Sequence, residues 1–345
     1  MAYTPIDKSD DYFNTVLWTG NATDNRSITG VNFKPDLVWY KERSSTSWHN
    51  LQDVVRGTGK QIHSNSTDSE TTNNGTIKAF ETDGFQIGTE ADINESGQTY
   101  VAWNWLASNT TASNTDGSIT STVSANTTSG FSIGTYTGNG SAGATVGHGL
   151  GATPKCFIVK RRNTAAQWNV YHESLGNTGA IYLNDFGTFN TVTGFWNNTS
   201  PNSNTFTLGT DAAGNGSSDT YVFYAFAEKK GFSKFGSYTG NGSTDGTFIY
   251  TGFKPAFVMI KNPATATDWE LIDNKRLGYN DLNYRLSPNS SASEQTTDRI
   301  ADILSNGFKI RNTSPAFNGS GNSIIYMAFA ENPLVGTNNI PTTAR

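Results

Sequence analysis

The four histidines, at His49, His63, His148 and His172, are the first residues to consider for catalysis. None stands in a zinc-binding H-E-x-x-H motif, and the chain has no G-x-S-x-G nucleophile motif, no CxxC pair and no phosphate loop. The glycine-rich stretch 138–143 is not followed by a helical pattern, so nucleotide binding is not expected. The sequence therefore predicts no catalytic residues, no cofactor and no metal site.

Paired carboxylates are the remaining route to catalysis, because glycosidases need only two carboxyl groups. Asp53 and Glu173 follow a tryptophan at the same distance in two parts of the chain, and a third part has Asn274 there. A residue that recurs between repeated parts indicates a structural role. We therefore interpret these acids as solvated loop residues and expect no enzyme.

Three tryptophans, Trp48, Trp168 and Trp269, occupy similar places in the three parts of the chain. An aromatic face can stack on a sugar ring, which leaves a ligand-binding role open. One aromatic residue per repeated unit at a fixed place is, however, typical of a core anchor. The sequence favours the core interpretation for all three.

A lysine ends the same predicted strand in each part: Lys41, Lys160 and Lys261. Three such lysines could bind an acidic ligand, but a charge that keeps a strand edge soluble is the favoured interpretation. Cys156 is the only cysteine, so no disulfide within the chain is possible. Its place inside a predicted strand indicates a small buried apolar residue.

These residues recur because the chain contains an internal repeat. A W/Y-T-G-N motif stands at 18–21, 136–139 and 238–241, and a proline precedes each repeated lysine at 35, 154 and 255. Each copy closes with a dense apolar segment, TYVAWNWLA, TYVFYAFAE or SIIYMAFAE. The spacing of these landmarks is nearly the same in every copy, which predicts three units of about 95 residues, the size of a small β-sandwich.

Short runs of β-branched and aromatic residues, bounded by proline and by Asn-Gly and Asp-Gly pairs, predict strands and tight turns. We expect an all-β protein made of three tandem, jelly-roll-like antiparallel β-sandwiches, with few short helices, the best at 296–307. The expected parts are an N-terminal arm at 1–12, repeats at 13–107, 131–230 and 231–331, a Ser/Thr-rich linker at 108–130 and a C-terminal arm at 332–345. We expect a weakly ordered linker and arms held by a neighbouring subunit.

Composition excludes several classes of protein. Aromatic residues make up 12% of the 345 residues and charged residues 15%, which argues against both a disordered chain and a helical bundle. The net charge of −5 argues against nucleic acid as a partner. No apolar run is long enough to span a membrane, and the first residues do not have the pattern of a signal peptide.

The segments 136–163 and 232–261, with the closing segment near 323–331, resemble a repeat family that is abundant in tailed phages of marine bacteria. The resemblance extends from about Phe13 to Arg345. It implies a virion structural protein, a tail, fibre or capsid-decorating component that is assembled in the host cytoplasm and displayed on the virion surface. The expected partners are other virion proteins, in a homo-oligomer or a multi-subunit assembly. The alternative is an adhesin for host attachment that binds a surface glycan.

Overall fold

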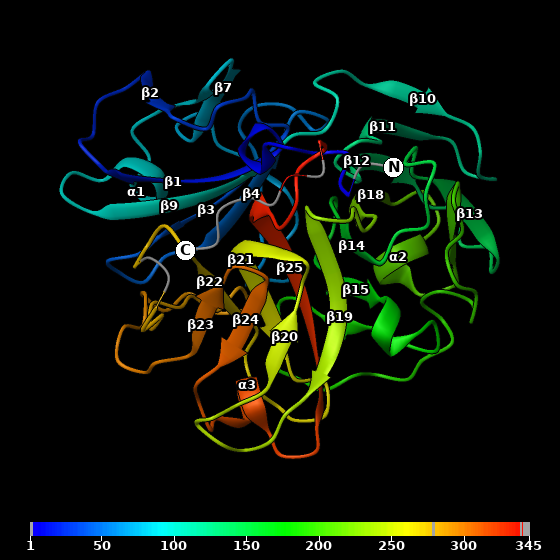
Figure 1. Ribbon diagram of the computed structural model, residues 1–345. Helices are drawn as coiled ribbons and strands as arrows, with labels where there is room; N and C mark the ends of the chain where they lie inside the picture. Colours follow the sequence, from blue (N-terminus) through cyan, green and yellow to red (C-terminus); the bar gives the residue numbers. More distant parts are fainter. Residues whose placement is uncertain (1–2, 278–279, 339, 341–345) are drawn as a thin grey trace.

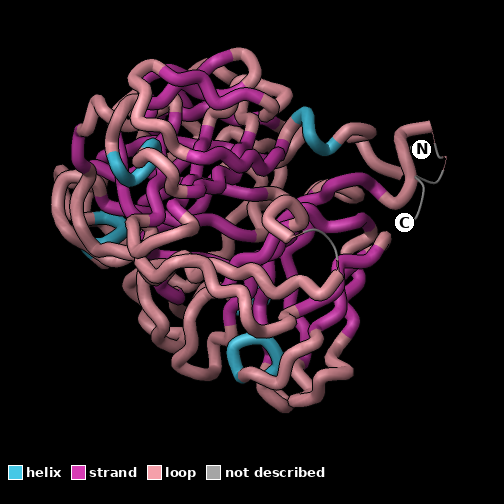
Figure 2. Tube along the Cα trace, turned by 90° about the vertical axis from the view of Figure 1, so that its left-hand side faces the viewer, coloured by secondary structure: helices cyan, strands magenta, loops and turns pink. Residues whose placement is uncertain are grey.

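Antiparallel strands dominate the protein, and its few helices are single turns (Figures 1 and 2). The computed structural model describes residues 3–277, 280–338 and 340. The all-β prediction is confirmed. Figure 1 shows three lobes, which we call unit 1 (residues 13–107, blue to cyan), unit 2 (108–230, green) and unit 3 (231–333, yellow to red).

Each unit pairs a large sheet with a small one. In unit 1 the large sheet is, in spatial order, β1 (Phe13–Thr19), β9 (Thr99–Trp105), β3 (Leu37–Glu42), β4 (His49–Asp53), β5 (Lys60–His63) and β6 (Thr71–Thr72). The small sheet consists of β2 (Arg26–Thr29), β8 (Gly84–Ile87) and β7 (Ile77–Glu81). The helical turns are η1 (Ser9–Asp11), just before the unit, and α1 (Ala91–Asn94).

Units 2 and 3 have the same order of four strands in their large sheets. The large sheet of unit 2 is, in spatial order, β10 (Ala112–Asn114), β11 (Ser121–Asn126), β12 (Phe131–Thr137), β18 (Thr220–Phe226), β14 (Cys156–Arg161), β15 (Trp168–His172) and β16 (Ile181–Tyr182). Its small sheet consists of β13 (Ala144–Gly147) and β17 (Thr205–Leu208), and its helical turns are η2 (Glu173–Leu175) and α2 (Ala212–Asn215). Unit 3 has β19 (Ser233–Thr239), β25 (Ser323–Pro333), β21 (Phe253–Lys261) and β22 (Glu270–Asp273), a small sheet of β20 (Phe248–Tyr250), β24 (Gly307–Ile310) and β23 (Ala301–Leu304), and turn α3 (Pro315–Asn318).

The closing strand of each unit is buried on both faces, which explains its dense apolar sequence. In β18, Tyr221 and Phe223 pack against the small sheet of unit 2. Tyr224 and Phe226, on the opposite face, join a cluster that contains residues of all three units. We call this cluster the shared core. The large sheets of units 1 and 2 therefore each serve two cores, one inside the unit and the shared core, whereas the interior of unit 3 is continuous with the shared core.

Three aromatic rings in corresponding places on the closing strands meet in the shared core. Trp105, Phe226 and Phe329 lie edge to face in all three pairings, with ring centroids 5.6–6.4 Å apart. Edge-to-face pairs at this separation are favourable because the positive edge of one ring meets the negative face of the next. The units are thus joined by buried packing as well as by the chain.

The W/Y-T-G-N motif has a structural explanation, seen here in unit 2. The Tyr136 hydroxyl donates to the Gly214 carbonyl in α2, and the Asn139 amide donates to the side chain of Asn215. A Cβ on Gly138 would lie 2.4 Å from the Gly216 carbonyl oxygen, so this position requires glycine. The same contacts join Trp18 to Ile93 and Asn21 to Asn94 in unit 1, and Tyr238 to Phe317 and Asn241 to Asn318 in unit 3.

The segment predicted as a weakly ordered linker, 108–130, is instead part of the large sheet of unit 2. β11 pairs with β12 along its whole length, and Ile119 and Val123 are buried in the core of that unit. The Asp36 carboxylate holds its start by accepting from the Ala107 and Asn109 amides, and burial raises the pKa of Asp36 to about 6. The segment needs few apolar residues to be ordered, because pairing of β11 with β12 provides hydrogen-bond partners for its backbone.

The helix predicted at 296–307 is also wrong, because this segment forms the hairpin β23–β24. Leu304 pairs directly with Gly307, which leaves a two-residue turn. The apolar residues Ala301, Ile303, Phe308 and Ile310 alternate with the polar Asp302 and Lys309, as in strands. Pairing of β24 with β20 therefore overrides a helical spacing that was compatible with either structure.

Residues 3–12 of the expected N-terminal arm pack on their own chain. The Tyr3 hydroxyl donates to the Gly252 carbonyl in unit 3, and Ile6 is buried in the shared core. Asp7 accepts hydrogen bonds from the amide and the hydroxyl of Thr337. At the other end, β25 continues to Pro333, into the expected C-terminal arm. Residues 1, 2, 339 and 341–345 of the two arms lie outside the described residues.

Candidate functional site

The three marked tryptophans do not share one environment. Trp168 and Trp269 are buried, and each donates its indole N–H to the preceding unit: Trp168 to the His63 and Ser66 carbonyls, Trp269 to the Tyr182 carbonyl. Trp48 is 39% exposed, and its ring stacks on that of His63. The prediction of a core anchor is therefore wrong for Trp48.

Strand register explains the difference. Lys160 lies opposite Trp168, but Lys41 lies opposite His49, because Trp48 follows its lysine one residue sooner than the other two tryptophans do. Successive side chains in a strand point to opposite faces. His49 therefore occupies the buried place that corresponds to Trp168, where it accepts from the Trp39 indole and burial holds its pKa well below the ordinary value.

The three repeated lysines are fully buried, so the prediction that they keep an exposed strand edge soluble is wrong. The Lys160 ammonium donates to the Thr67 carbonyl of unit 1, and Lys261 donates to the Phe186 carbonyl of unit 2. Lys41 donates to carbonyls of its own unit. Burial lowers the pKa of all three to about 8. These lysines bind loops of the protein rather than an acidic ligand.

A buried ion network lies at the junction between units 1 and 2. Arg56 pairs with Asp53 at 2.5 Å and with Glu70 at 3.1 Å, and Glu70 also pairs with Arg162 of unit 2 at 2.9 Å. The Tyr224 hydroxyl of unit 2 donates to Asp53 at 2.8 Å. The ion pair between Asp53 and Arg56 is completely buried.

The same network recurs between units 3 and 1. There Arg276 pairs with Asp273 at 2.6 Å and with Glu294 at 2.9 Å, and Glu294 pairs with Arg43 of unit 1 at 2.8 Å. The Trp103 indole of unit 1 donates to Asp273 at 3.0 Å. The sequence carries a trace of both networks, since D-x-x-R occurs at 53–56 and at 273–276, and this recurrence was missed.

The third junction, between units 2 and 3, has other residues in the four corresponding places. His172 replaces the aspartate and donates to the Tyr326 carbonyl of unit 3, while burial lowers its pKa to about 4. Leu175 takes the place of Arg56 and Arg276, Phe189 that of Glu70 and Glu294, and Pro263 that of Arg162 and Arg43. The Phe189 amide donates to the Pro263 carbonyl, just as the Glu70 and Glu294 amides donate to Arg162 and Arg43. This junction thus keeps the backbone contact but replaces the charges.

These contacts remove the carboxylate pair as a catalytic candidate. The interpretation of these acids as solvated loop residues is wrong for Asp53, which ends β4 and is buried in its ion pair, whereas Glu173 is on the surface with Lys155. Corrected by strand register, the residues that correspond to one another are Asp53, His172 and Asp273. Each of the three contacts the next unit around the ring, so their recurrence reflects packing.

Glu270 is a carboxyl group with a pKa near neutrality, because burial raises its pKa to about 7. A carboxyl with a raised pKa is a candidate acid, but this one is only 5% exposed, and Arg285 lies 3.7 Å from it. It is therefore a structural group inside unit 3.

We expect Glu270 to make stability depend on pH. Between its ordinary pKa of 4.5 and its folded value of about 7, the folded protein keeps a proton that the unfolded chain releases. The free energy of unfolding therefore falls as the pH rises through this window, by at most about 3 kcal/mol. Glu270→Gln should flatten the decline in denaturant titrations, and exposed Glu95→Gln should not. An equal slope for Glu270→Gln would contradict the assignment.

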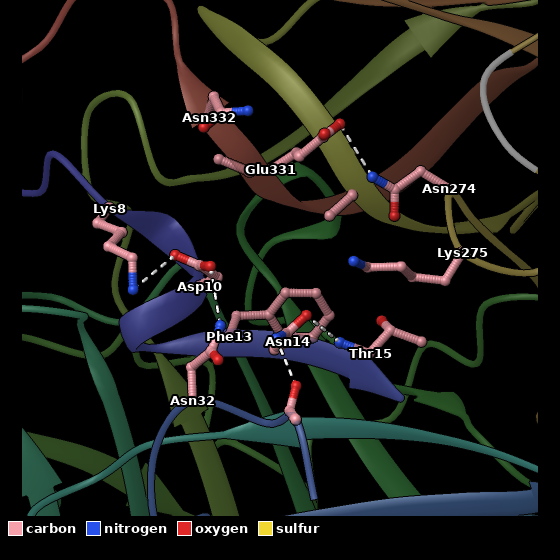
Figure 3. A pocket seen from close by; sticks show the side chains of 13 residues that line it. Lys8, Asp10, Phe13, Asn14, Thr15, Asn32, Asn274, Lys275, Glu331 and Asn332 are labelled. Atoms are coloured by element: carbon pink, nitrogen blue, oxygen red, sulfur yellow. Dashed lines mark hydrogen bonds and ion pairs between the residues drawn. The ribbon is translucent and has the colours of Figure 1, made fainter. Parts of the chain in front are cut away.

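A polar pocket of about 390 Å³ opens between units 1 and 3 (Figure 3). Figure 3 shows one wall formed by η1 and β1 and the other by the end of β25 and the loop after β22. The polar side chains around it are Lys8, Asp10, Asn14, Thr15, Asn32, Asn274, Lys275, Glu331 and Asn332. Phe13, Ala256 and Ala330 contribute its apolar floor. Sequence reasoning missed this site because its residues come from distant segments that share no motif.

Most charges in the pocket are fixed by partners. Asp10 lies 3.5 Å from the Lys8 ammonium and accepts from the Asn32 amide at 2.9 Å. Glu331 accepts from the Asn274 amide at 2.9 Å and pairs with Lys254 at 3.0 Å. The arrangement offers both acceptors and donors to a small polar ligand.

No cluster of histidine, cysteine, aspartate or glutamate suited to a metal ion occurs within residues 3–277, 280–338 and 340. Over the same ranges, every helix is too short or too polar to cross a bilayer.

Fold and pocket define a class: an all-β protein whose antiparallel sheets meet in one shared core, with a polar pocket between units 1 and 3. The chain belongs to the family described as a domain of unknown function (DUF7483), whose model matches residues 8–333. No curated protein and no solved structure matches the chain.

Proposed function

We propose that this protein is a non-enzymatic structural component on the exterior of a tailed-phage virion, in the tail or decorating the capsid. The observation that carries the proposal is the closure of three β units around one buried core, with ion networks at two junctions. Such a block resists local opening, because each unit is held by both of its neighbours. The resemblance of 136–163 and 232–261 to phage repeat proteins supports the same role.

In this proposal the protein is assembled in the host cytoplasm and acts through contacts with other virion proteins. Electron microscopy of purified particles, labelled with an antibody to the protein and gold, tests the location. Labelling at one fixed place on the particle surface is expected. Absence of the protein from purified particles, with the protein present in the lysate, would overturn the proposal.

We further propose that the three units are copies of one sandwich. The shared order β1-β9-β3-β4, β12-β18-β14-β15 and β19-β25-β21-β22 supports common descent. A superposition in which Pro35, Pro154 and Pro255 take unlike places relative to these strands would contradict it.

The second candidate function is that of an adhesin that binds a host-surface glycan. The pocket between units 1 and 3 favours it, since amide, carboxyl and ammonium groups surround a cavity of about 390 Å³. Cavities of about 300–1,000 Å³ with a few placed polar groups are the usual sites for small ligands. Binding of the isolated protein to host cells or to their surface polysaccharide is expected, and failure of both would exclude this role.

A further inference from the structure

The pocket lies at the junction between units 3 and 1, where residues 3–12 lead from unit 3 into β1 of unit 1. The chain passes from unit 1 to unit 2 next to Asp36 and from unit 2 to unit 3 through residues 227–232. At the junction between units 3 and 1 the connection is the N-terminal segment, whose Tyr3 hydroxyl donates to the Gly252 carbonyl of unit 3. Loop contacts such as that between Arg43 and Glu294 add to it. The η1 turn of the N-terminal segment forms one wall of the pocket.

A difference in sequence between units 1 and 3 leaves room in the pocket. Asp36 precedes the repeated Lys41 by the same distance as Ala256 precedes Lys261. In unit 1 the Asp36 carboxylate accepts hydrogen bonds from the backbone amides of the chain that leads to unit 2, at 2.7 Å from Ala107 and 3.0 Å from Asn109. In unit 3 the methyl group of Ala256 instead forms part of the pocket floor. The pocket thus has a small apolar floor where its counterpart has an anion.

Lys275 supplies a cation that the described residues do not neutralise. It is exposed, and no hydrogen bond or ion pair to its ammonium occurs within the part of the chain that the structure describes. Figure 3 shows its side chain directed into the pocket, between Asn274 and Thr15. Lys8, by contrast, is already engaged by Asp10 and Asp11. The Lys275 ammonium is therefore available to an anionic group of a ligand.

We propose that this pocket binds a uronic acid, a sugar residue that carries a carboxylate. The inference rests on the second candidate function, glycan binding, and names the ligand of that site. The ligand carboxylate pairs with Lys275, and its hydroxyl groups donate to Asp10 and Glu331 and accept from Asn32 and Asn332. The apolar face of the sugar ring lies toward Ala256, with Phe13 and Ala330 buried beneath it.

Calorimetric titration of the full chain with glucuronic acid, its oligomers and its methyl ester tests the proposal. The acid should bind at least about tenfold more tightly than the ester, since the ester lacks the charge that Lys275 recognises. Lys275→Met should abolish this preference, and Asn332→Asp should reduce it by repulsion. Lys34→Met is the matched control, because Lys34 lines a second pocket of about 390 Å³ between units 1 and 2, and binding should not change.

Equal binding of acid and ester, wild-type affinity of Lys275→Met, or no binding of monomer or oligomer at about 10 mM would overturn the proposal. Circular dichroism of each variant establishes that it is folded. These results are independent of the virion location. Attachment of the protein to host glycans without a preference for uronic acids would retain the adhesin role and reject only the ligand proposed here.

Discussion

Arg56→Met is expected to lower the free energy of unfolding by about 3–5 kcal/mol, because it leaves Asp53 charged and buried without its cation. Asp53 keeps the Tyr224 hydroxyl and the amides of Val55 and Arg56, which do not supply a positive charge. Glu70 keeps its pair with Arg162. The loss should therefore come mainly from one unpaired carboxylate.

A second substitution separates charge from packing. Asp53→Asn removes the stranded charge, so the double variant Asp53→Asn with Arg56→Met should be more stable than Arg56→Met alone. Arg299→Met is the control for an exposed ion pair, since the Arg299 side chain is 45% exposed, and it should cost less than about 1 kcal/mol. Denaturant titration measures all three. Equal losses for Arg56→Met and Arg299→Met would show that the buried network does not stabilise the junction.

Phe329→Ala is expected to cost about 3–5 kcal/mol and to destabilise all three units together. Its ring is 1% exposed and contacts rings of every unit, Phe13 and Trp105 in unit 1, Phe226 in unit 2, and Phe232, Phe235 and Phe257 in unit 3. Truncation leaves a cavity where the three sheets meet. Calorimetry should record one cooperative transition, shifted to lower temperature.

The matched control is Phe186→Ala. Phe186 is 58% exposed, so its truncation should change stability by no more than about 0.5 kcal/mol. A split transition for Phe329→Ala, with units 1 and 2 melting as in the parent, would show that the units have independent cores.

The repeat predicted the strands of the large sheets because its landmarks carry backbone requirements. The glycine of W/Y-T-G-N faces a carbonyl oxygen. Pro35 and Pro154 precede strands that are buried on both faces, and Pro255 lies within such a strand at a register shift. The segment 108–130 was misjudged because its strands are polar on one face and gain order from pairing with β12, which composition does not reveal. The hairpin at 301–310 was misjudged because three apolar residues fit either period.

The functional interpretation failed where position depends on a single residue of register. Trp48 lies one residue earlier in the strand register than Trp168 and Trp269. Because successive side chains of a strand point to opposite faces, this shift leaves the Trp48 side chain exposed. The buried lysines were read as edge charges because their acceptors, the Thr67 and Phe186 carbonyls, belong to another unit. The pocket residues have no shared spacing at all, so only the fold brings them together.

Because the three junctions differ in chemistry, a unit of one chain is less able to pair with the wrong unit of a neighbouring chain during folding. Similar units in neighbouring nascent chains risk exchanging partners, as repeat proteins do when they misassemble. Units 1 and 3 both present an Asp–Arg–Glu set that pairs with an arginine of the next unit. Unit 2 presents His172, Leu175 and Phe189 instead, and the Phe189 amide donates to the Pro263 carbonyl of unit 3. Docking Arg43 or Arg162 on unit 2 would bury a guanidinium without a carboxylate. The junction between units 2 and 3 thus disfavours assemblies in which units pair in the wrong order.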